Sequence, residues 1–284
     1  MELNIVYWYK IPIILCDLPP RAKREFLLPI FILGFLFCKK KYICDIIYIK
    51  KAGIFMNLSR LEALVTSEGI EKIKKLKVLV LGLGGVGGYV VESLTRCGVE
   101  NITLVDGDII KPSNINRQLV VTSNNNNKYK TREWKKRIKS INKNAVVNII
   151  NMYLTEDNIS SIFSNDYTYD YIVDACDTTK VKVSLIKECH ERGIKLISSM
   201  GTANKLDATK LRITTLDKTD TDPLAKKIRK EFSRKKEIMK DVTVVVSDEK
   251  PINTKMLGSS PFVPGVAGLY ITNYIIKDVV DSLN

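Results

Sequence analysis

The sequence is poor in residues that many catalytic and metal sites require. Its 284 residues include one histidine, His190, which falls in an expected helix from Val181 to Arg192 and is interpreted as a surface or packing residue. No Ser/His/Asp or Cys/His arrangement is therefore expected. The six cysteines contain no CxxC pair, so the chain cannot build a zinc site from two such pairs, and their spacing gives no disulfide framework.

Long apolar runs are also scarce. The run from Phe26 to Cys38 has thirteen residues, whereas a membrane-spanning helix needs about twenty. Basic residues flank the run, and Pro29 and Gly34 weaken it as a helix. The run therefore predicts no ordinary membrane span.

We divide the chain into an N-terminal extension, residues 1–55, and one large domain, residues 56–284. The extension has three interpretations: a signal-like or organellar leader, a membrane-proximal segment, or sequence upstream of a true start at Met56. The protein is expected in the cytoplasm if translation starts near Met56. Otherwise it is expected in an organelle or at a membrane.

A glycine loop, LGLGGVGG, follows the apolar run Val78 to Leu81 and precedes a helical pattern. This is the strand, turn and helix order of a nucleotide-binding unit. Gly82 permits a tight turn, Gly87 lets the helix pack on the strand, and the free amides of the helix N-terminus attract an anion. The glycines expected to hold phosphates are Gly82, Gly84, Gly85 and Gly87.

A second strand, Ile102 to Val105, ends in Asp106, where a carboxylate accepts hydrogen bonds from ribose hydroxyls. Strand and helix signals alternate along the domain. We therefore expect an α/β fold with a Rossmann-like, doubly wound, mostly parallel sheet, a C-terminal antiparallel extension and a closing helix. These features alone fit a nicotinamide or flavin enzyme equally well.

The run SNINRQ, residues 113–118, favours an ATP-using enzyme. Arg117 offers a planar fork that neutralises phosphate oxygens, although an arginine of a polar surface loop is the alternative. Another buried strand, Tyr171 to Ala175, brings Asp174 and Asp177 to the ligand-binding edge of the sheet, where two acids suit Mg²⁺. For Asp174, a structural hydrogen bond at the strand end is the open alternative.

The motifs LGLGGVGG, VDGD, NINRQ and DACD together resemble the adenylyltransferases related to ubiquitin-activating enzymes, the ThiF/MoeB type. Two later segments, SSMGTANKLDATKLRITTLDKTDTDPLAKKIRKEF and GSSPFVPGVAGL, are similar to the tRNA threonylcarbamoyladenosine dehydratases. The resemblance extends from about Leu58 to the C-terminus. It implies one ATP-binding adenylyltransferase domain over residues 56–284.

The resemblance implies an ATP- and Mg²⁺-dependent enzyme without zinc. Such enzymes adenylate the threonyl carboxylate of threonylcarbamoyladenosine beside the tRNA anticodon, and cyclisation then expels AMP, with net loss of water. The resemblance does not decide whether the cyclised product is an oxazolone or a hydantoin. One alternative is an adenylyltransferase for the C-terminus of a ubiquitin-like or sulfur-carrier protein. Another is a non-catalytic nucleotide-binding adaptor.

The resemblance also implies residue roles. Asn114 and Arg117 address the triphosphate, and Asp177 holds Mg²⁺ near the α-phosphate. Lys130 reaches the phosphates, although the asparagine tract before it leaves Lys128 as an alternative. Arg60 matches an arginine that reaches a neighbouring subunit's ATP site, which implies a homodimer. A solvated arginine at a helix start is the alternative for Arg60.

The formal net charge of +14 suits a polyanionic partner such as tRNA. Two basic segments, Lys130 to Lys139 and Lys226 to Lys240, carry apolar stripes at helical spacing, so each is expected to form a docked helix with a basic outer face. A sulfur-transfer protein is a further partner implied by the resemblance. The candidate tRNA contacts are Lys135, Lys136, Arg137, Lys139, Lys226, Lys227, Arg229 and Lys230.

Overall fold

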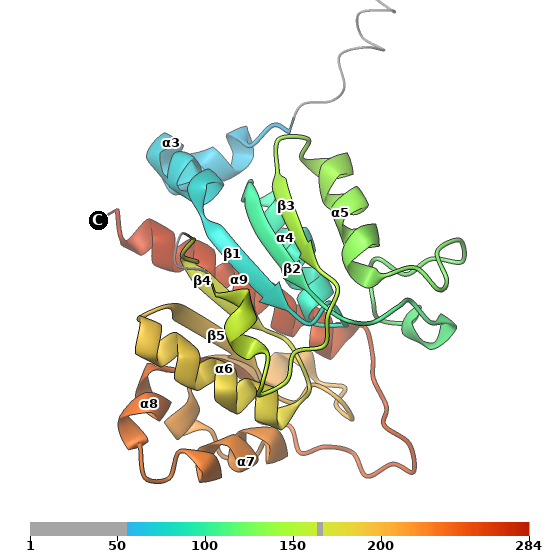
Figure 1. Cartoon of the computed structure of the whole chain (residues 1–284), viewed down its shortest axis with the longest axis vertical. Coiled ribbons are helices and arrows are strands. Elements are labelled where there is room, and N and C mark those ends of the chain that lie inside the picture. Colours follow the sequence, from blue (N-terminus) through green and yellow to red (C-terminus); the bar gives the residue numbers. More distant parts are fainter. Residues whose placement is uncertain (1–55, 164–166, 284) are drawn as a thin grey trace, which may run out of the picture. The chain divides into compact units, whose positions relative to one another are not determined.

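The computed structural model describes residues 56–163 and 167–283 (Figure 1). The expectations for residues 1–55 therefore lie outside the described residues. One seven-stranded sheet, in the order β3-β2-β1-β4-β5-β7-β6, organises the described part. The strands are β1 Lys77–Leu81, β2 Asn101–Val105, β3 Val146–Ile150, β4 Tyr171–Asp174, β5 Lys195–Ser199, β6 Leu211–Thr215 and β7 Thr243–Ser247.

All neighbouring strands run parallel except β6, which pairs antiparallel with β7. The expected mostly parallel sheet with an antiparallel extension is confirmed. The α-helices are α3 Ser59–Lys75, α4 Gly87–Arg96, α5 Lys130–Ile141, α6 Thr179–Arg192, α7 Pro223–Glu231, α8 Lys236–Asp241 and α9 Phe262–Asp281. The short 3₁₀ turns are η2 Pro112–Asn114, η3 Ile159–Ile162, η4 Ala208–Lys210 and η5 Leu216–Lys218.

The helices cover both faces of the sheet, and the inner strand β1 contributes to both cores. Val78 and Val80 join a core with α3, α4, α5 and α9, whereas Leu79 and Leu81 join a core with α6, α7 and α8. Successive strand residues point to opposite faces, so a strand buried on both sides reads as a continuous apolar run. This is why the sequence of β1 lacks polar alternation.

The C-terminal helix α9 closes the first face by packing on α4. A Cβ atom on Gly268 of α9 would lie 2.6 Å from the carbonyl oxygen of Val86, so only glycine admits this close approach. The expected closing helix is therefore confirmed. In the described ranges, 56–163 and 167–283, no helix is both long enough and apolar enough to cross a bilayer.

The second basic segment differs from expectation, because it forms two helices instead of one. α7 ends at Glu231, and α8 begins at Lys236. Phe232 between them is buried, and so are Ile238 and Met239 of α8, all in the same core. The chain thus turns after Phe232, and both α7 and α8 bury apolar residues in the core that contains α6.

Candidate active site

A cleft of about 670 Å³ opens at the carboxyl ends of the parallel strands. It is lined by parts of the glycine loop, the turn after β2, the 113–118 loop, the loop after β4 and the loop after β5. Doubly wound sheets bind ligands at this edge. Of the residues singled out in the sequence, the cleft lining includes Gly82, Gly84, Gly85, Asp106, Asn114, Arg117, Lys130 and Asp177.

Close contacts require glycine at the first and the last of the four candidate phosphate-binding positions, Gly82 and Gly87. Gly82 has φ +84°, and a Cβ atom there would lie 2.7 Å from the carbonyl oxygen of Ala175. A Cβ atom on Gly87 would lie 1.8 Å from the carbonyl oxygen of Gly82. Larger residues at either position would push the loop away from β4 or from α4, so Gly87 acts through helix packing and does not line the cleft.

The middle glycines meet far less crowding. A Cβ atom on Gly84 would meet only the Gln118 side-chain nitrogen, at 3.8 Å, and one on Gly85 would lie 3.2 Å from Cβ of Pro264. Both glycines line the cleft beside the N-terminus of α4. The first amides of a helix lack intrahelical acceptors, so this position suits a phosphate.

Asp106 follows β2 and lies at the bottom of the cleft. Its Oδ2 accepts a hydrogen bond from the Leu83 amide at 2.7 Å, and its Oδ1 accepts one from the Asp108 amide at 2.7 Å. Burial raises the pKa of this carboxyl group, and the charge of Lys130 offsets part of the effect. Each carboxylate oxygen has a second lone pair, which leaves acceptors for ribose hydroxyls.

Lys130 begins α5, and its side chain is 5% exposed. Its Nζ lies 2.7 Å from Asp108 Oδ2 and 3.8 Å from Asp106 Oδ2. Burial opposes ionisation of Asp108, but hydrogen bonds from Lys130 and Tyr153 outweigh it and lower the pKa of Asp108. Lys128 is exposed and does not line the cleft, so the geometry favours Lys130 over Lys128.

The 113–118 loop supports Arg117 from two sides. Its Nη1 donates to the Ser113 carbonyl oxygen and to Asn116 Oδ1, both at 2.9 Å. The Asn114 side chain accepts from the Lys111 amide at 3.1 Å and thereby caps the 3₁₀ turn η2. Arg117 is half-buried at the cleft, and its remaining guanidinium hydrogens are the donors available to a phosphate.

The two acids at the carboxyl end of β4, Asp174 in the strand and Asp177 after it, have different environments. Asp177 is exposed and lines the cleft. Asp174 is completely buried and pairs with Lys182 at 2.9 Å, which corrects the expectation that both acids face a metal. The structural alternative for Asp174 holds. Between them, burial raises the pKa of the Cys176 thiol, which disfavours the nucleophilic thiolate.

Arg60 lies exposed in the first turn of α3, and it does not line the cleft of its own chain. His190 lies on α6, with its Nδ1 3.5 Å from Asp241 Oδ2, and is also outside the cleft lining.

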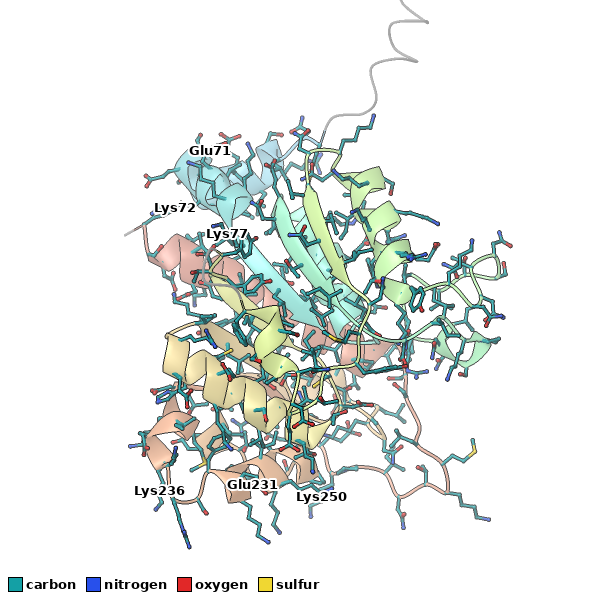
Figure 2. All side chains as sticks on the ribbon, viewed as in Figure 1. Glu71, Lys72, Lys77, Glu231, Lys236 and Lys250 are labelled. Carbon is teal, nitrogen blue, oxygen red and sulfur yellow. The ribbon has the colours of Figure 1, made fainter. Side chains whose placement is uncertain are left out.

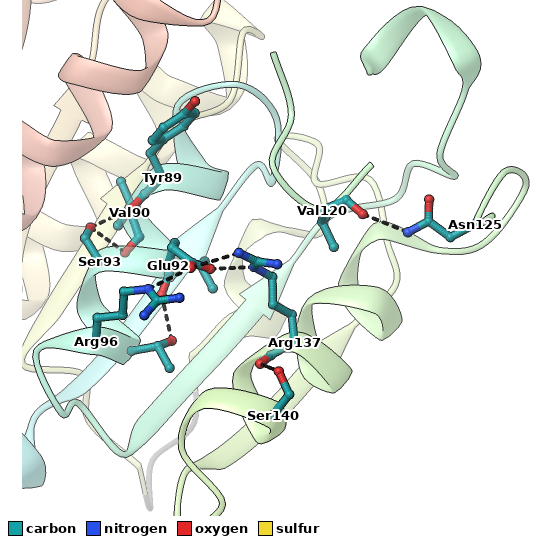
Figure 3. A network of polar contacts seen from close by, with 11 residues as sticks. Tyr89, Val90, Glu92, Ser93, Arg96, Val120, Asn125, Arg137 and Ser140 are labelled. Atoms are coloured by element: carbon teal, nitrogen blue, oxygen red, sulfur yellow. Dashed lines mark hydrogen bonds and ion pairs between the residues drawn. The ribbon is translucent and has the colours of Figure 1, made fainter. Parts of the chain in front are cut away.

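The candidate tRNA contacts divide into two groups. Six lysines are exposed on α5 and α7: Lys135, Lys136, Lys139, Lys226, Lys227 and Lys230. The two arginines are engaged within the chain. Arg137 forms two hydrogen bonds to Glu92, at 2.6 and 2.9 Å (Figure 3), and Arg229 bonds to the carbonyl and hydroxyl oxygens of Thr219. Two of the lysines also have contacts within the chain, because Lys136 Nζ pairs with Glu133 Oε1 at 2.6 Å and Lys139 Nζ donates to the Lys143 carbonyl oxygen at 3.1 Å. All six lysines nevertheless remain exposed, so they are more accessible to phosphates than the half-buried arginines.

Several residues of the cleft lining were not predicted from the sequence. Tyr153 follows β3, and its hydroxyl donates to Asp108 Oδ1 at 2.5 Å, which raises the pKa of Tyr153 to about 12. The loop Gly201 to Ala203 and the side chain of Leu257 also line the cleft. No strand was expected before Gly201 or before Tyr153, so the strand ends that would have marked these two positions became visible only in the structure. Leu257 follows no strand directly and carries no such signal.

Comparisons with known proteins agree with this geometry. The family model described as the ThiF family matches residues 58–280. A tRNA threonylcarbamoyladenosine dehydratase of Bacillus subtilis is 41% identical over 244 residues, which cover 79% of this chain and 95% of the relative. A molybdopterin-synthase adenylyltransferase of Haemophilus influenzae is 31% identical over 134 residues, 47% of this chain and 54% of that relative.

A solved structure of E. coli tRNA N6-threonylcarbamoyladenosine dehydratase in complex with ATP has a TM-score of 0.75 and 26% sequence identity, covering 81% of this chain and 98% of that one. The similarity to dehydratases that the sequence motifs indicated is thus confirmed. Because the family model matches well over half of the chain, the protein belongs to the ThiF family.

Proposed function

We propose that the protein catalyses the ATP-dependent dehydration of threonylcarbamoyladenosine in tRNA through an acyl-adenylate. The observation that carries this proposal is the charged cleft at the ThiF-type glycine loop, in a chain so similar to named dehydratases. Arg117, Lys130 and Asp177 come from three different loops or helices and meet at one cleft. A triphosphate needs such a set of donors and a metal-binding acid.

The chemistry follows from the weakness of a carboxylate as an electrophile. An oxygen of the threonyl carboxylate attacks the α-phosphorus of ATP, and pyrophosphate leaves. The carbamoyl group of the same side chain then attacks the activated carbon, and AMP leaves with the former carboxylate oxygen. The nucleophile is intramolecular, so its effective concentration is high and the protein needs mainly to bind and orient the reactants.

The glycine loop and the N-terminus of α4 would bind phosphate through backbone amides. Asp106 would accept hydrogen bonds from the ribose, while Asn114 orders the turn that carries Arg117. Arg117 and Lys130 would stabilise the negative charge that develops on the phosphate oxygens during adenylyl transfer. The ion pair with Asp108 holds the Lys130 side chain in the cleft before ATP arrives.

The residues fit Mg²⁺ as a companion of ATP. In residues 56–163 and 167–283, no three His, Cys, Asp or Glu side chains gather into a metal-binding group. Mg²⁺ is usually held by one or two carboxylates together with phosphates and water, so the single exposed carboxylate of Asp177 is adequate. When bound, Mg²⁺ neutralises charge on the phosphate oxygens.

We further propose a homodimer in which Arg60 serves the partner's cleft. The exposure of Arg60 and its absence from its own cleft support this assignment. The six exposed lysines of α5 and α7 would bind tRNA phosphates, because both helices begin beside the cleft, which Lys130 of α5 and Leu224 in the first turn of α7 line. Such contacts add affinity without sequence readout.

The runner-up is adenylation of a carrier-protein C-terminus, and it is supported by the similarity to the Haemophilus influenzae relative, whose name describes an adenylyltransferase. That reading would also account for a sulfur-transfer protein partner. The higher identity and longer coverage of the Bacillus subtilis dehydratase favour the tRNA substrate.

The deciding experiment is mass spectrometry of tRNA nucleosides after incubation with enzyme and ATP. Loss of one water from threonylcarbamoyladenosine, with AMP and pyrophosphate released in equal amounts, is expected. Unchanged nucleoside together with adenylation of a carrier-protein C-terminal peptide would overturn the dehydratase assignment.

A further inference from the structure

A strap, defined as residues 248–260, connects β7 to α9 and passes the mouth of the cleft. Both ends of its outer loop are fastened to one residue, Asn204. The Asn204 carbonyl oxygen accepts from the Ile252 amide at 2.7 Å, its amide donates to the Gly258 carbonyl at 2.9 Å, and its Oδ1 accepts from the Gly258 amide at 2.6 Å. The strap therefore has a fixed base.

Two further contacts fix the flanks of the strap. The Glu249 carboxylate accepts from the Leu206 amide at 3.1 Å and from the Asp207 amide at 2.9 Å. At the other end, the Ser259 carbonyl oxygen accepts from Asn116 Nδ2 at 3.0 Å, next to Arg117. The base of the strap is thus bound to the same loop that carries a candidate catalytic arginine.

The tip of the strap, residues 253–257, is exposed. Met256 is 82% and Leu257 is 83% exposed, and Leu257 lines the cleft. Lys250 and Lys255 are also exposed. Figure 2 labels Lys250 and shows the side chains of this loop extending away from the body of the ribbon. The strap tip therefore offers an adjacent apolar pair, Met256 and Leu257, next to the positive charge of Lys255.

A nucleotide of single-stranded RNA has the matching chemistry, with an apolar base face next to a phosphate. An enzyme that acts on a base must also hold it outside the stack between apolar side chains. Resting on the proposed function, we propose that the strap recognises the substrate nucleotide, with Met256 and Leu257 against the purine and Lys255 on an adjoining phosphate.

The strap, rather than the glycine loop, then distinguishes the tRNA substrate from ATP. The nucleotide phosphates belong at the N-terminus of α4, beside Gly84 and Gly85. The strap tip is instead exposed, and it lies in the chain between the contacts of Ile252 and Gly258 that fasten the strap to Asn204. Changes at the tip are expected to affect tRNA and to spare ATP.

The test compares wild type with a Met256→Ser/Leu257→Ser double variant in steady-state dehydration of tRNA carrying threonylcarbamoyladenosine. The double variant should raise the KM for tRNA by about tenfold, because two apolar contacts worth roughly 1.4 kcal/mol together are lost. The KM for ATP should stay unchanged. Lys255→Ala should instead flatten the salt dependence of tRNA binding by about one unit of slope.

Val146→Ser is the matched control, because Val146 is 55% exposed at the amino end of β3, away from the cleft. A tRNA KM in the double variant within twofold of the control overturns the inference, as does an equal rise in the KM for ATP. A change in sedimentation would assign the tip to contact between two copies and also overturn it. If wild type itself fails to dehydrate the tRNA, the proposed function fails and the strap inference fails with it.

Discussion

Lys182 and Asp174 form an ion pair whose side chains are both completely buried, with 2.9 Å between Nζ and Oδ2. Lys182 Nζ also donates to Ser198 Oγ at 3.1 Å and to the Ser199 carbonyl oxygen at 2.8 Å. All three ammonium hydrogens therefore have acceptors. The pair joins α6 to the ends of β4 and β5, directly beneath the loops that line the cleft.

Removing one member of this pair should be severely destabilising. Lys182→Met leaves the Asp174 carboxylate buried without its cation, which is expected to lower the free energy of unfolding by about 3–5 kcal/mol. Urea denaturation measures the loss. The control is Lys72→Met, which removes an exposed pair with Glu68 at 3.6 Å and should cost below about 1 kcal/mol. Equal effects of the two substitutions would contradict this account of the buried pair.

This pair also marks a limit of sequence analysis. The sequence predicted that Asp174 and Asp177 lie at a strand end, and both do lie at the carboxyl edge of the sheet. Which acid enters the cleft depends on the strand register and on a lysine eight residues later in α6. The open alternative for Asp174 could be resolved only once Lys182, Ser198 and Ser199 were brought together.

Local patterns predicted the rest of the fold well because they act over few residues. The glycine loop, β1, β2 and the start of α5 follow from apolar periodicity and turn chemistry between neighbours. The break between α7 and α8 and the cleft positions of Tyr153 and Leu257 depend on packing between distant segments. The engagement of Arg137 by Glu92, 45 residues away, is of the same kind.

Alanine substitutions at two glycines of the loop, Gly87 and Gly84, should have different effects on stability and on ATP binding. Gly87→Ala places a Cβ 1.8 Å from the Gly82 carbonyl oxygen, so the loop or α4 must move and the melting temperature should fall. Gly84→Ala meets only a flexible side-chain nitrogen at 3.8 Å. It should keep the wild-type melting temperature but weaken ATP binding, because the methyl group occupies the cleft. Differential scanning calorimetry and ATP titration test both variants. A Gly84→Ala variant with a lower melting temperature and intact ATP affinity would contradict the assignment of Gly84 to the phosphate site.

A shared active site would be revealed by mixing two inactive chains. Arg60→Ala and Asp177→Asn should each abolish AMP formation, since one removes the arginine supplied to the partner and the other removes the magnesium ligand. A mixed dimer regenerates one cleft with both groups, so activity of up to about half per mixed dimer is expected from simple site counting.

The control for this experiment is Asp157→Asn, which alters an exposed acid outside the cleft and should retain full activity alone. Sedimentation and subunit exchange are measured in parallel. A monomer, or exchange of subunits without recovered activity, would exclude Arg60 as a residue acting in the partner's cleft.

The last prediction concerns the exposed lysines of α7. Reversal of Lys226, Lys227 and Lys230 to glutamate should weaken tRNA binding, and each lost phosphate contact should lower the slope of log affinity against log salt by about 0.9. ATP affinity should change much less, because none of the three lysines lines the cleft and exposed charges are screened at physiological salt. Titrations of both ligands over a salt series measure these effects.

Arg137→Gln is the informative contrast to these reversals. Because Glu92 already holds the Arg137 guanidinium with two hydrogen bonds, its removal should reduce stability and leave the tRNA salt slope unchanged. If Arg137→Gln flattens the slope while the α7 reversals do not, the phosphate-binding surface lies on α5 with its arginine released from Glu92. The lysine assignment on α7 would then be wrong.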